Sequence, residues 1–243
     1  MKIFVVSLSS SVERRERMQR QLDQLQIEFE FFDAVDGSKP NFLNSDKVDN
    51  ALTYSRKGYQ LKNGEVACFS SHYELWKVCI SLNQPIIILE DNVDISEDFP
   101  QLIEPLNRVI RQFDYVKLAA TLPVKFNPIK QIISRYSIGQ YGKKTCGTTA
   151  YAVSPEAAKQ FILHAEKFIE PVDDYLEKPW RHGVKTYSIA PSLFQRAQIA
   201  STISSSSNHR KAKSGLSKLN KFRVELYRTY ESVMRFFFWD HSK

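Results

Sequence analysis

A short apolar run that ends in acidic residues is the feature that most limits how this chain can fold. Residues 85–89 are PIIIL, and Glu90, Asp91 and Asp94 follow closely. Consecutive β-branched residues without polar alternation are typical of a buried strand. In α/β proteins the residues that follow such strands lie at the sheet edge where ligands bind. The run therefore predicts an α/β fold with a site at the end of this strand.

Strand-like and helix-like segments alternate along most of the chain. The expected strands are residues 2–8, 27–32, 85–90, 113–118 and 147–153, and the expected helices begin near Ser10, span residues 65–81 and begin at Ser154. His72, Leu75, Trp76 and Cys79 lie on one face of the second helix. Residues 41–60 are polar and irregular, which predicts a loop over the site. The alternation favours a mainly parallel central sheet flanked by helices.

The positive charge is concentrated near the end of the chain. The 243 residues have a formal net charge of +7, but nine Lys and Arg and three acidic residues from Asn208 onward account for +6 of it. We therefore expect a neutral domain over residues 1–207 and a basic tail over residues 208–243. The serine-rich residues 201–207 are the predicted joint.

The tail has apolar residues at intervals of three or four positions, which predicts a basic amphipathic helix. These are Leu216, Leu219, Phe222, Leu226, Tyr230, Val233, Met234 and Phe237. Such a helix binds an anionic membrane surface, where each nearby Lys or Arg contributes about 1 kcal/mol. Packing on the body or on a partner is the alternative. Nucleic-acid binding through the tail is a rival function, which the neutral body disfavours.

Several common classes of protein are disfavoured by inspection. No apolar run approaches the roughly 18 residues of a membrane span, and residues 1–8 lack the features of a secretion signal, so a cytoplasmic protein is expected. Cys68, Cys79 and Cys146 are an odd number at wide spacing, which favours reduced thiols. The chain has no phosphate-binding loop, no G-x-G-x-x-G, no G-x-S-x-G and no H-x-x-x-H pair.

The acidic cluster after residues 85–89 is the first candidate site. Glu90, Asp91, Asn92 and Asp94 offer oxygen ligands that suit a hard divalent cation, and a cation there could neutralise a nucleotide diphosphate. A solvated turn is the alternative. Arg14 and Arg15 could hold a phosphate group, or lie on a solvated helix face. Tyr151 and Trp180 are possible stacking surfaces for a ligand, or core aromatics.

Several ordered blocks of this sequence resemble glycosyltransferase family 25. They are KIFVVSL (residues 2–8) with Arg14 and Arg15, FFDAVDG (31–37), GEVACFSSH (64–72) with Trp76, ILEDNV (88–93), GTTAY (147–151), PVD (171–173) and PSL (191–193) with residues 201–203. The family includes lipooligosaccharide galactosyltransferases of Gram-negative bacteria and collagen galactosyltransferases of animals. The resemblance implies a GT-A fold, a UDP-galactose donor, a manganese-type cation and inversion at the anomeric carbon.

The resemblance also implies roles for particular residues. Asp173 is the expected general base, with Asp174 as its competitor, although a helix N-cap would explain the same carboxylates. Asp91, Asn92 and Asp94 are the expected metal ligands, and Asn92 stands where the family usually has a second Asp. His72 is a substrate contact or a core histidine. The expected donor-binding residues are Ser7, Leu8, Arg14, Arg15, Glu65, Ser70, His72, Glu90 and Asp91.

The functional expectation is transfer of galactose to a lipooligosaccharide or lipopolysaccharide core sugar at the inner face of the bacterial inner membrane. The tail would provide peripheral membrane contact, and no nucleic acid is expected as a partner. Asn92 leaves open an alternative, a sugar-nucleotide-binding protein of the same fold with weak or lost catalysis, because an amide ligand brings no charge to a cation.

Overall fold

A computed structural model describes residues 1–120, 125–145, 147–197 and 216–238. The predicted domain boundary after residue 207, the serine-rich joint and Cys146 lie outside these residues. Within the described part of the chain, no helix has both the length and the apolar character that a membrane crossing requires.

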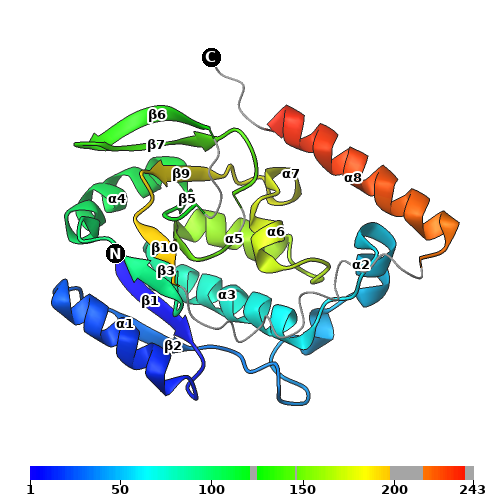
Figure 1. Cartoon of the computed structure of the whole chain (residues 1–243), viewed down its shortest axis with the longest axis horizontal. Coiled ribbons are helices and arrows are strands. Elements are labelled where there is room, and N and C mark those ends of the chain that lie inside the picture. Colours follow the sequence, from blue (N-terminus) through cyan, green and yellow to red (C-terminus); the bar gives the residue numbers. More distant parts are fainter. Residues whose placement is uncertain (121–124, 146, 198–215, 239–243) are drawn as a thin grey trace.

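The centre of the molecule is an eight-stranded mixed sheet (Figure 1). Its order is β2-β1-β3-β8-β5-β9-β7-β6. The strands are β1 (Lys2–Ser7), β2 (Glu30–Asp33), β3 (Ile86–Glu90), β5 (Tyr115–Lys117), β6 (Phe126–Ile133), β7 (Tyr136–Tyr141), β8 (Ala150–Val153) and β9 (Tyr187–Ala190). A separate pair is formed by β4 (Val93–Ile95) and β10 (Phe194–Arg196).

The expectation of a mainly parallel sheet holds only in part, because parallel and antiparallel pairs are mixed along the sheet. Strand β1 is parallel to both β2 and β3, and β5 is parallel to β9. Strand β8 is antiparallel to both of its neighbours, β3 and β5, and β7 is antiparallel to β9 and β6. Because β8 runs opposite to β3, the start of β8 lies at the edge where β3 ends.

Two helical layers cover the two faces of the sheet. Ile87 and Leu89 of β3 face the core that contains α1 (Val12–Gln24) and α4 (Phe99–Phe113). Ile86 and Ile88 face the core that contains α3 (Asn63–Leu82), α5 (Pro155–Leu163) and α6 (Val172–Leu176). The four apolar side chains of β3 are fully buried, as the apolar run predicts.

Residues 41–60 were expected to be a loop, and the structure corrects this. The segment contains a short 3-10 helix (η1, Ser45–Lys47) and helix α2 (Asn50–Lys57). The Asp49 side chain caps α2 by accepting a hydrogen bond from the Leu52 backbone N–H, and Gly58 ends it with a positive φ of 77°. The helix is short and polar, so its sequence lacks the apolar periodicity by which longer helices are recognised.

The last described helix, α8 (Lys218–Phe238), packs against α2 and α7 (Pro179–His182) at one side of the molecule (Figure 1). Val224 is buried in this contact, and Tyr227 lies under the Arg56 guanidinium, 5.1 Å from it. The opposite face carries exposed apolar side chains. They are Leu219, Phe222, Leu226, Tyr230, Val233 and Phe237, here called the α8 ridge.

Candidate active site

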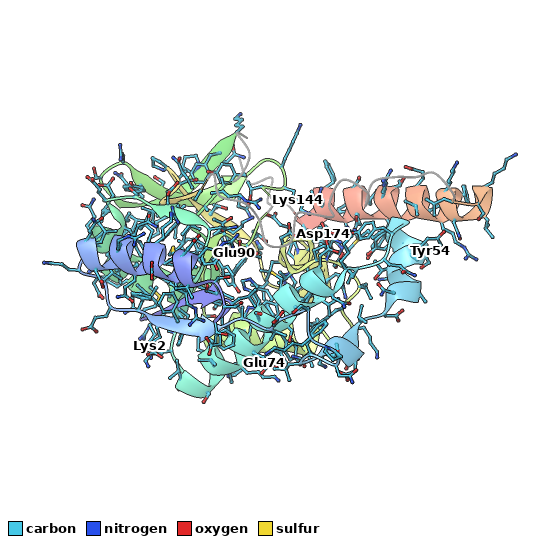
Figure 2. The ribbon with its side chains drawn as sticks, turned by 60° about the horizontal axis from the view of Figure 1, so that its bottom comes forward. Lys2, Tyr54, Glu74, Glu90, Lys144 and Asp174 are labelled. Carbon is cyan, nitrogen blue, oxygen red and sulfur yellow. The ribbon has the colours of Figure 1, made fainter. Side chains whose placement is uncertain are left out.

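The candidate site lies at the edge of the sheet where β1, β3 and β5 end and β8 begins. Ser7, Glu90 and Lys117 are the last residues of the three strands, and Thr148 precedes β8. Parallel strands present their carboxyl ends on one edge, which explains why residues distant in sequence meet there. Figure 2 shows Glu90 near the middle of the molecule, with Asp174 and Lys144 close together beside α8.

Asp91 is held by two side chains from the first strand–helix unit. The Ser7 hydroxyl donates to Asp91 Oδ2 at 2.7 Å, and Arg14 Nη1 donates to Asp91 Oδ1 at 2.8 Å. Asp91 is buried, so this carboxylate depends on both partners. The structure thus brings together three of the expected donor-binding residues.

Arg15 holds the end of β1 in place. Its Nη2 donates to the Ser7 carbonyl at 2.8 Å and its Nε to the Leu8 carbonyl at 3.2 Å, and it also pairs with Asp33 at the end of β2. A single guanidinium therefore ties together the ends of two strands. The hydrogen bond from Arg15 also positions the backbone of Leu8, another residue expected to bind the donor.

The three residues expected to ligate a metal differ in their surroundings. Both Asp91 oxygens are already bonded, and the exposed Asp94 carboxylate pairs with Arg17. Asn92 differs, because its buried Oδ1 has no hydrogen-bond partner among the described residues. The Asn92 backbone carbonyl accepts a hydrogen bond from Ala197 at 2.8 Å, which fixes the turn after β3.

Glu90, the last residue of β3, lies on the side of the site that contains Thr148 and Asp173. The Thr148 hydroxyl donates to Glu90 Oε1. Burial raises the pKa of Glu90, the Thr148 hydrogen bond opposes this rise, and the nearby Asp173 and Asp91 carboxylates add to it. Glu90 thus lies among carboxylates, and Arg196 of β10 is a cation close enough to lower its pKa in part.

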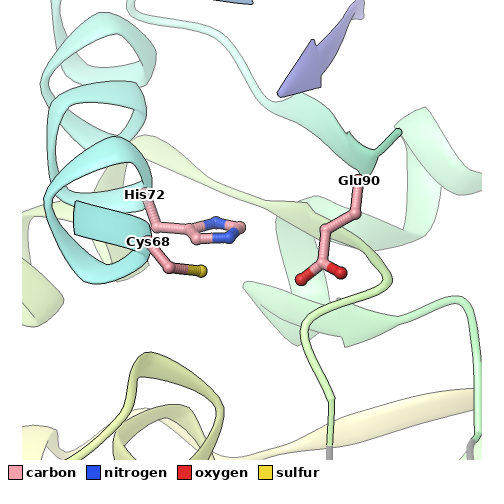
Figure 3. Close-up of side chains that lie close together, drawn as sticks. All are labelled: Cys68, His72 and Glu90. Carbon is pink, nitrogen blue, oxygen red and sulfur yellow. The ribbon is translucent and has the colours of Figure 1, made fainter. Parts of the chain in front are cut away.

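Glu90 also faces Cys68 and His72 of α3 (Figure 3). The two α3 residues are four positions apart, so they project from the same face of the helix. Ligand atoms of the three side chains lie within 4.8 Å of one another. Burial lowers the pKa of His72 to about 4, so the ring is neutral at physiological pH. Burial raises the pKa of the Cys68 thiol well above its ordinary value, and Glu90 and Asp173 raise it further.

The two adjacent carboxylates in α6 have different surroundings. Asp173 is partly buried and accepts hydrogen bonds from the backbone N–H groups of Asp174, at 2.8 Å, and Gly147, at 3.4 Å. No ion pair to Asp173 occurs among the described residues. Because it raises the pKa of both Glu90 and Cys68, the Asp173 carboxylate belongs to the same electrostatic cluster.

Asp174 instead belongs to a buried ion network. Its partners are Lys57, Lys144 and Lys178. Burial alone would raise the pKa of Asp174, but these lysines hold it well below its ordinary value. A carboxylate with so low a pKa is a poor proton acceptor. Of the two candidates for the base, the geometry favours Asp173.

Glu231 of α8 completes this ion network. Lys57 Nζ lies 2.7 Å from Glu231 Oε1 and 2.9 Å from Asp174 Oδ2. Lys178 pairs with Asp174, Glu231 and the buried Glu170. The network joins α2, α6 and α8, which are far apart in the sequence.

Three other residues singled out in the sequence serve the scaffold. Glu65 accepts a hydrogen bond from the Lys62 backbone N–H at 3.0 Å and so caps the start of α3. Buried Ser70 donates to the Leu43 carbonyl at 2.7 Å, which holds the preceding loop. Tyr151 is fully buried, so its ring cannot serve as a stacking surface for a sugar.

Cys68, Thr148, Arg196 and the lysines of the ion network were not predicted as part of the site. The spacing of Cys68 and His72 was a usable signal, because residues at i and i+4 share a helix face. Thr148 and Arg196 carry no such signal, since only the antiparallel course of β8 and the pairing of β10 with β4 bring them to Glu90.

Comparison with known proteins identifies the family. Residues 1–176 match the model of glycosyltransferase family 25, described as an LPS biosynthesis protein family. The lipooligosaccharide biosynthesis protein lic2B of Haemophilus influenzae is 36% identical over 169 residues, which cover 66% of this chain and 62% of that protein. Procollagen galactosyltransferase 1-A of Xenopus laevis is 28% identical over 200 residues, covering 76% of this chain and 32% of that protein.

A human relative, inactive glycosyltransferase 25 family member 3, is 29% identical over 191 residues, covering 72% of this chain and 31% of that protein. This chain thus spans about three fifths of the bacterial relative and about a third of the animal ones. The match over residues 1–176 contains β1, β3, α6 and the acidic residues at their ends. By this match the chain belongs to glycosyltransferase family 25.

Proposed function

We propose that this chain transfers galactose from UDP-galactose to a sugar of a lipooligosaccharide or lipopolysaccharide core, with inversion at the anomeric carbon. Family membership and the name of the bacterial relative, a lipooligosaccharide biosynthesis protein, support the reaction class and the acceptor class. The layered α/β fold, with its site at the carboxyl ends of β1 and β3, is compatible with a GT-A arrangement.

The observation that carries the mechanism is the contrast between Asp173 and Asp174. Inversion requires a base that takes the acceptor proton while the hydroxyl attacks the face opposite the departing diphosphate. Asp173 is oriented by backbone N–H groups and has no ion pair among the described residues, whereas Asp174 is neutralised by lysines. In our proposal Asp173 accepts that proton.

The leaving UDP needs positive charge at the other end of the site. Arg14 and Arg15 lie at the ends of β1 and β2, and Arg196 is exposed beside Glu90. Guanidinium groups stabilise phosphate oxygens through paired, charge-assisted hydrogen bonds. We assign Arg196 to the diphosphate, while Arg14 holds Asp91 toward the ribose.

The resemblance to the family implies a manganese ion at Asp91, Asn92 and Asp94. Arg14 and Ser7 already occupy the Asp91 oxygens, and Asp94 pairs with Arg17. Asn92 Oδ1, by contrast, is buried and has no hydrogen-bond partner in the described part of the chain. The Asp91 and Asp94 carboxylates thus already have charged partners, which disfavours them as ligands of one ion, and no step of the mechanism uses such an ion.

Peripheral contact with the inner face of the bacterial inner membrane is part of the proposal. The α8 ridge faces away from the contact with α2 and α7, and Lys218, Lys221 and Arg223 accompany it on the same helix. Exposed apolar residues beside basic ones suit an anionic lipid surface. The glycolipid acceptor would be met at that surface.

The test is a transfer assay on the purified protein. UDP-galactose, UDP-glucose and UDP-N-acetylglucosamine are offered with a truncated lipooligosaccharide acceptor, and the anomeric configuration of the product is read by NMR. We expect transfer from UDP-galactose with inversion. Transfer with retention, or from another donor alone, would contradict the proposal.

A second candidate is a sugar-nucleotide-binding protein without transferase activity. Two observations favour it: the neutral Asn92 in the acidic turn, and the similarity to the human inactive glycosyltransferase 25 family member 3. The same assay separates the two candidates. Thermal stabilisation by UDP-galactose without transfer or hydrolysis would support this one.

A further inference from the structure

The two buried histidines of α3 and α7 differ in how their ring nitrogens are satisfied. His182 Nε2 lies 3.2 Å from the Tyr175 carbonyl, and its Nδ1 accepts from the Val184 N–H at 3.2 Å. His72 is fully buried, and its Nδ1 lies 2.8 Å from Tyr151 Oη. Its Nε2 has no hydrogen-bond partner among the described residues. A buried polar atom left unpaired costs about 1–3 kcal/mol, so this nitrogen needs an explanation.

The unpaired nitrogen belongs to a group of three potential metal ligands. Cys68, His72 and Glu90 offer one sulfur, one nitrogen and one oxygen within 4.8 Å of one another (Figure 3). A zinc ion lies about 2.0–2.3 Å from such ligands, so ligand atoms around it are roughly 3–4 Å apart. His72 Nε2 has no hydrogen-bond partner among the described residues, and the three side chains are close enough for one ion to bridge them.

Neighbouring side chains orient two of the three potential ligands by hydrogen bonds. A histidine that binds metal through Nε2 donates its Nδ1–H to a second residue, and Tyr151 Oη is in that position for His72. Trp76 Nε1 donates to the same Oη at 3.0 Å, which fixes the phenol. Thr148 bonds to Glu90 Oε1 and leaves Oε2 for a cation.

We propose that Cys68 Sγ, His72 Nε2 and Glu90 Oε2 bind one zinc ion. Three protein ligands around a tetrahedral ion leave one position for a water or a ligand oxygen. The proposal does not depend on the transferase activity, because metal binding is measured directly.

The donor set favours zinc over manganese. Thiolate and imidazole suit zinc, whereas manganese prefers carboxylate, carbonyl and water oxygens. Affinity at a site with nitrogen and sulfur ligands also rises from manganese to zinc. A cation in this family member would therefore be bound by a softer set of ligands than the acidic turn at residues 90–94 offers.

The experiment uses full-length protein freed of metal by chelation and then titrated with zinc, manganese and cobalt(II). We expect one zinc per chain by elemental analysis, much weaker binding of manganese, and a cobalt–thiolate charge-transfer band. Cys68→Ser should remove the band and weaken zinc binding on the order of 100-fold, and Tyr151→Phe should weaken it about 10–100-fold. X-ray absorption at the zinc edge should show one sulfur ligand.

Cys79→Ser is the matched control. Cys79 lies on the same helix and is also buried, but its thiol points to the backbone carbonyls of Gln84 and Val153. This variant should bind zinc as the unaltered protein does. Melting curves without metal identify a variant that fails to fold, and the partly buried Cys68 is the safer position for the decisive variant. Zinc binding that survives Cys68→Ser, or the absence of the cobalt band in the unaltered protein, would overturn the proposal.

Discussion

Arg14 and Asp91 lie 77 positions apart in the sequence and form a hydrogen-bonded ion pair of 2.8 Å between Nη1 and Oδ1. The pair connects the first helix to the turn after β3, and the Ser7 hydroxyl completes it from β1. It is mostly buried, with 16% and 11% of the two side chains exposed. An ion pair in such a place fixes position more than it adds stability, because both charges are largely removed from water.

Removing Arg14 should therefore leave Asp91 buried with one partner fewer. We expect Arg14→Ala to lower the free energy of unfolding by about 3 kcal/mol and to raise the KM for the donor. Denaturant unfolding and donor titration measure the two effects. Arg20→Ala is the control on the same helix, because its pair with Glu16 is exposed and spans 3.9 Å, so a change within about 0.5 kcal/mol is expected.

Asp173→Asn should remove the base and leave the fold intact. We expect kcat to fall on the order of 10²–10⁴-fold with little change in melting temperature.

Asp174→Asn should lower stability and leave turnover nearly unchanged, because three lysines lose a buried partner while the base remains. An unfolding free energy lower by about 3 kcal/mol, with near-normal turnover per folded molecule, is the expected result. If Asp174→Asn abolished turnover and Asp173→Asn did not, the assignment would be reversed.

Asn92→Asp should make the acidic turn responsive to manganese. The buried Oδ1 has no partner among the described residues, so a carboxylate there would be an unpaired charge next to Asp91. We expect the variant to lose about 2 kcal/mol of stability in chelator, or about 4–8 °C in melting temperature. Added Mn²⁺ should restore the lost stability. Equal melting curves with and without Mn²⁺ would show that the turn does not bind the ion.

His182 predicts a pH dependence of stability. Burial lowers its pKa to about 3, from 6.5 in the unfolded chain. Between these values the unfolded state binds a proton that the folded state does not, so stability is full above pH 6.5 and falls as the pH drops toward 3. By pH 5 the loss amounts to about 2 kcal/mol.

The comparison variant is His182→Gln. Its amide can donate to the Tyr175 carbonyl and accept from the Val184 N–H, the two bonds that the imidazole makes. Urea unfolding at several pH values should give a shallower slope between pH 6.5 and 5 for this variant. An unchanged slope would assign the dependence to other groups.

Membrane contact is tested by placing acidic side chains on the apolar α8 ridge. Phe222 and Phe237 are 61% and 73% exposed, so Phe222→Glu with Phe237→Glu should abolish sedimentation with anionic vesicles without altering the fold. Vesicles of neutral lipid are the control, and they should bind weakly because the basic side chains gain nothing there. Retention of the double variant on anionic vesicles would exclude the ridge as the contact.

Local patterns predicted some parts of the fold and not others. Strand β3 was predictable, because an apolar run of this length needs cover on both faces. The antiparallel course of β8 was not, since a strand of four apolar residues pairs equally well in either direction. The hairpin of β6 and β7 was also missed, because β6 is mostly exposed and lacks apolar alternation.

The same division holds at the site. Asp91 was predictable from its place directly after β3. The different surroundings of Asp173 and Asp174 were not, because the lysines that neutralise Asp174 come from positions 57, 144 and 178. Asp173 and Asp174 are the same residue type and adjacent in the sequence. The sequence therefore does not show which of them will be surrounded by lysines in the folded protein.

The ion network between α8 and the body has a consequence for where the protein can be shortened. Composition alone makes residues 208–243 a detachable appendage. Glu231, however, is a counter-charge for two lysines, and Lys178 is fully buried. A truncation before α8 would leave the buried Lys178 ammonium with fewer carboxylate partners. It would also disturb Asp174, the direct neighbour of Asp173. The helix that we propose attaches the enzyme to a membrane is thus also part of the buried ion network that supports α6, so removing α8 should lower the stability of the folded protein as well as its membrane binding.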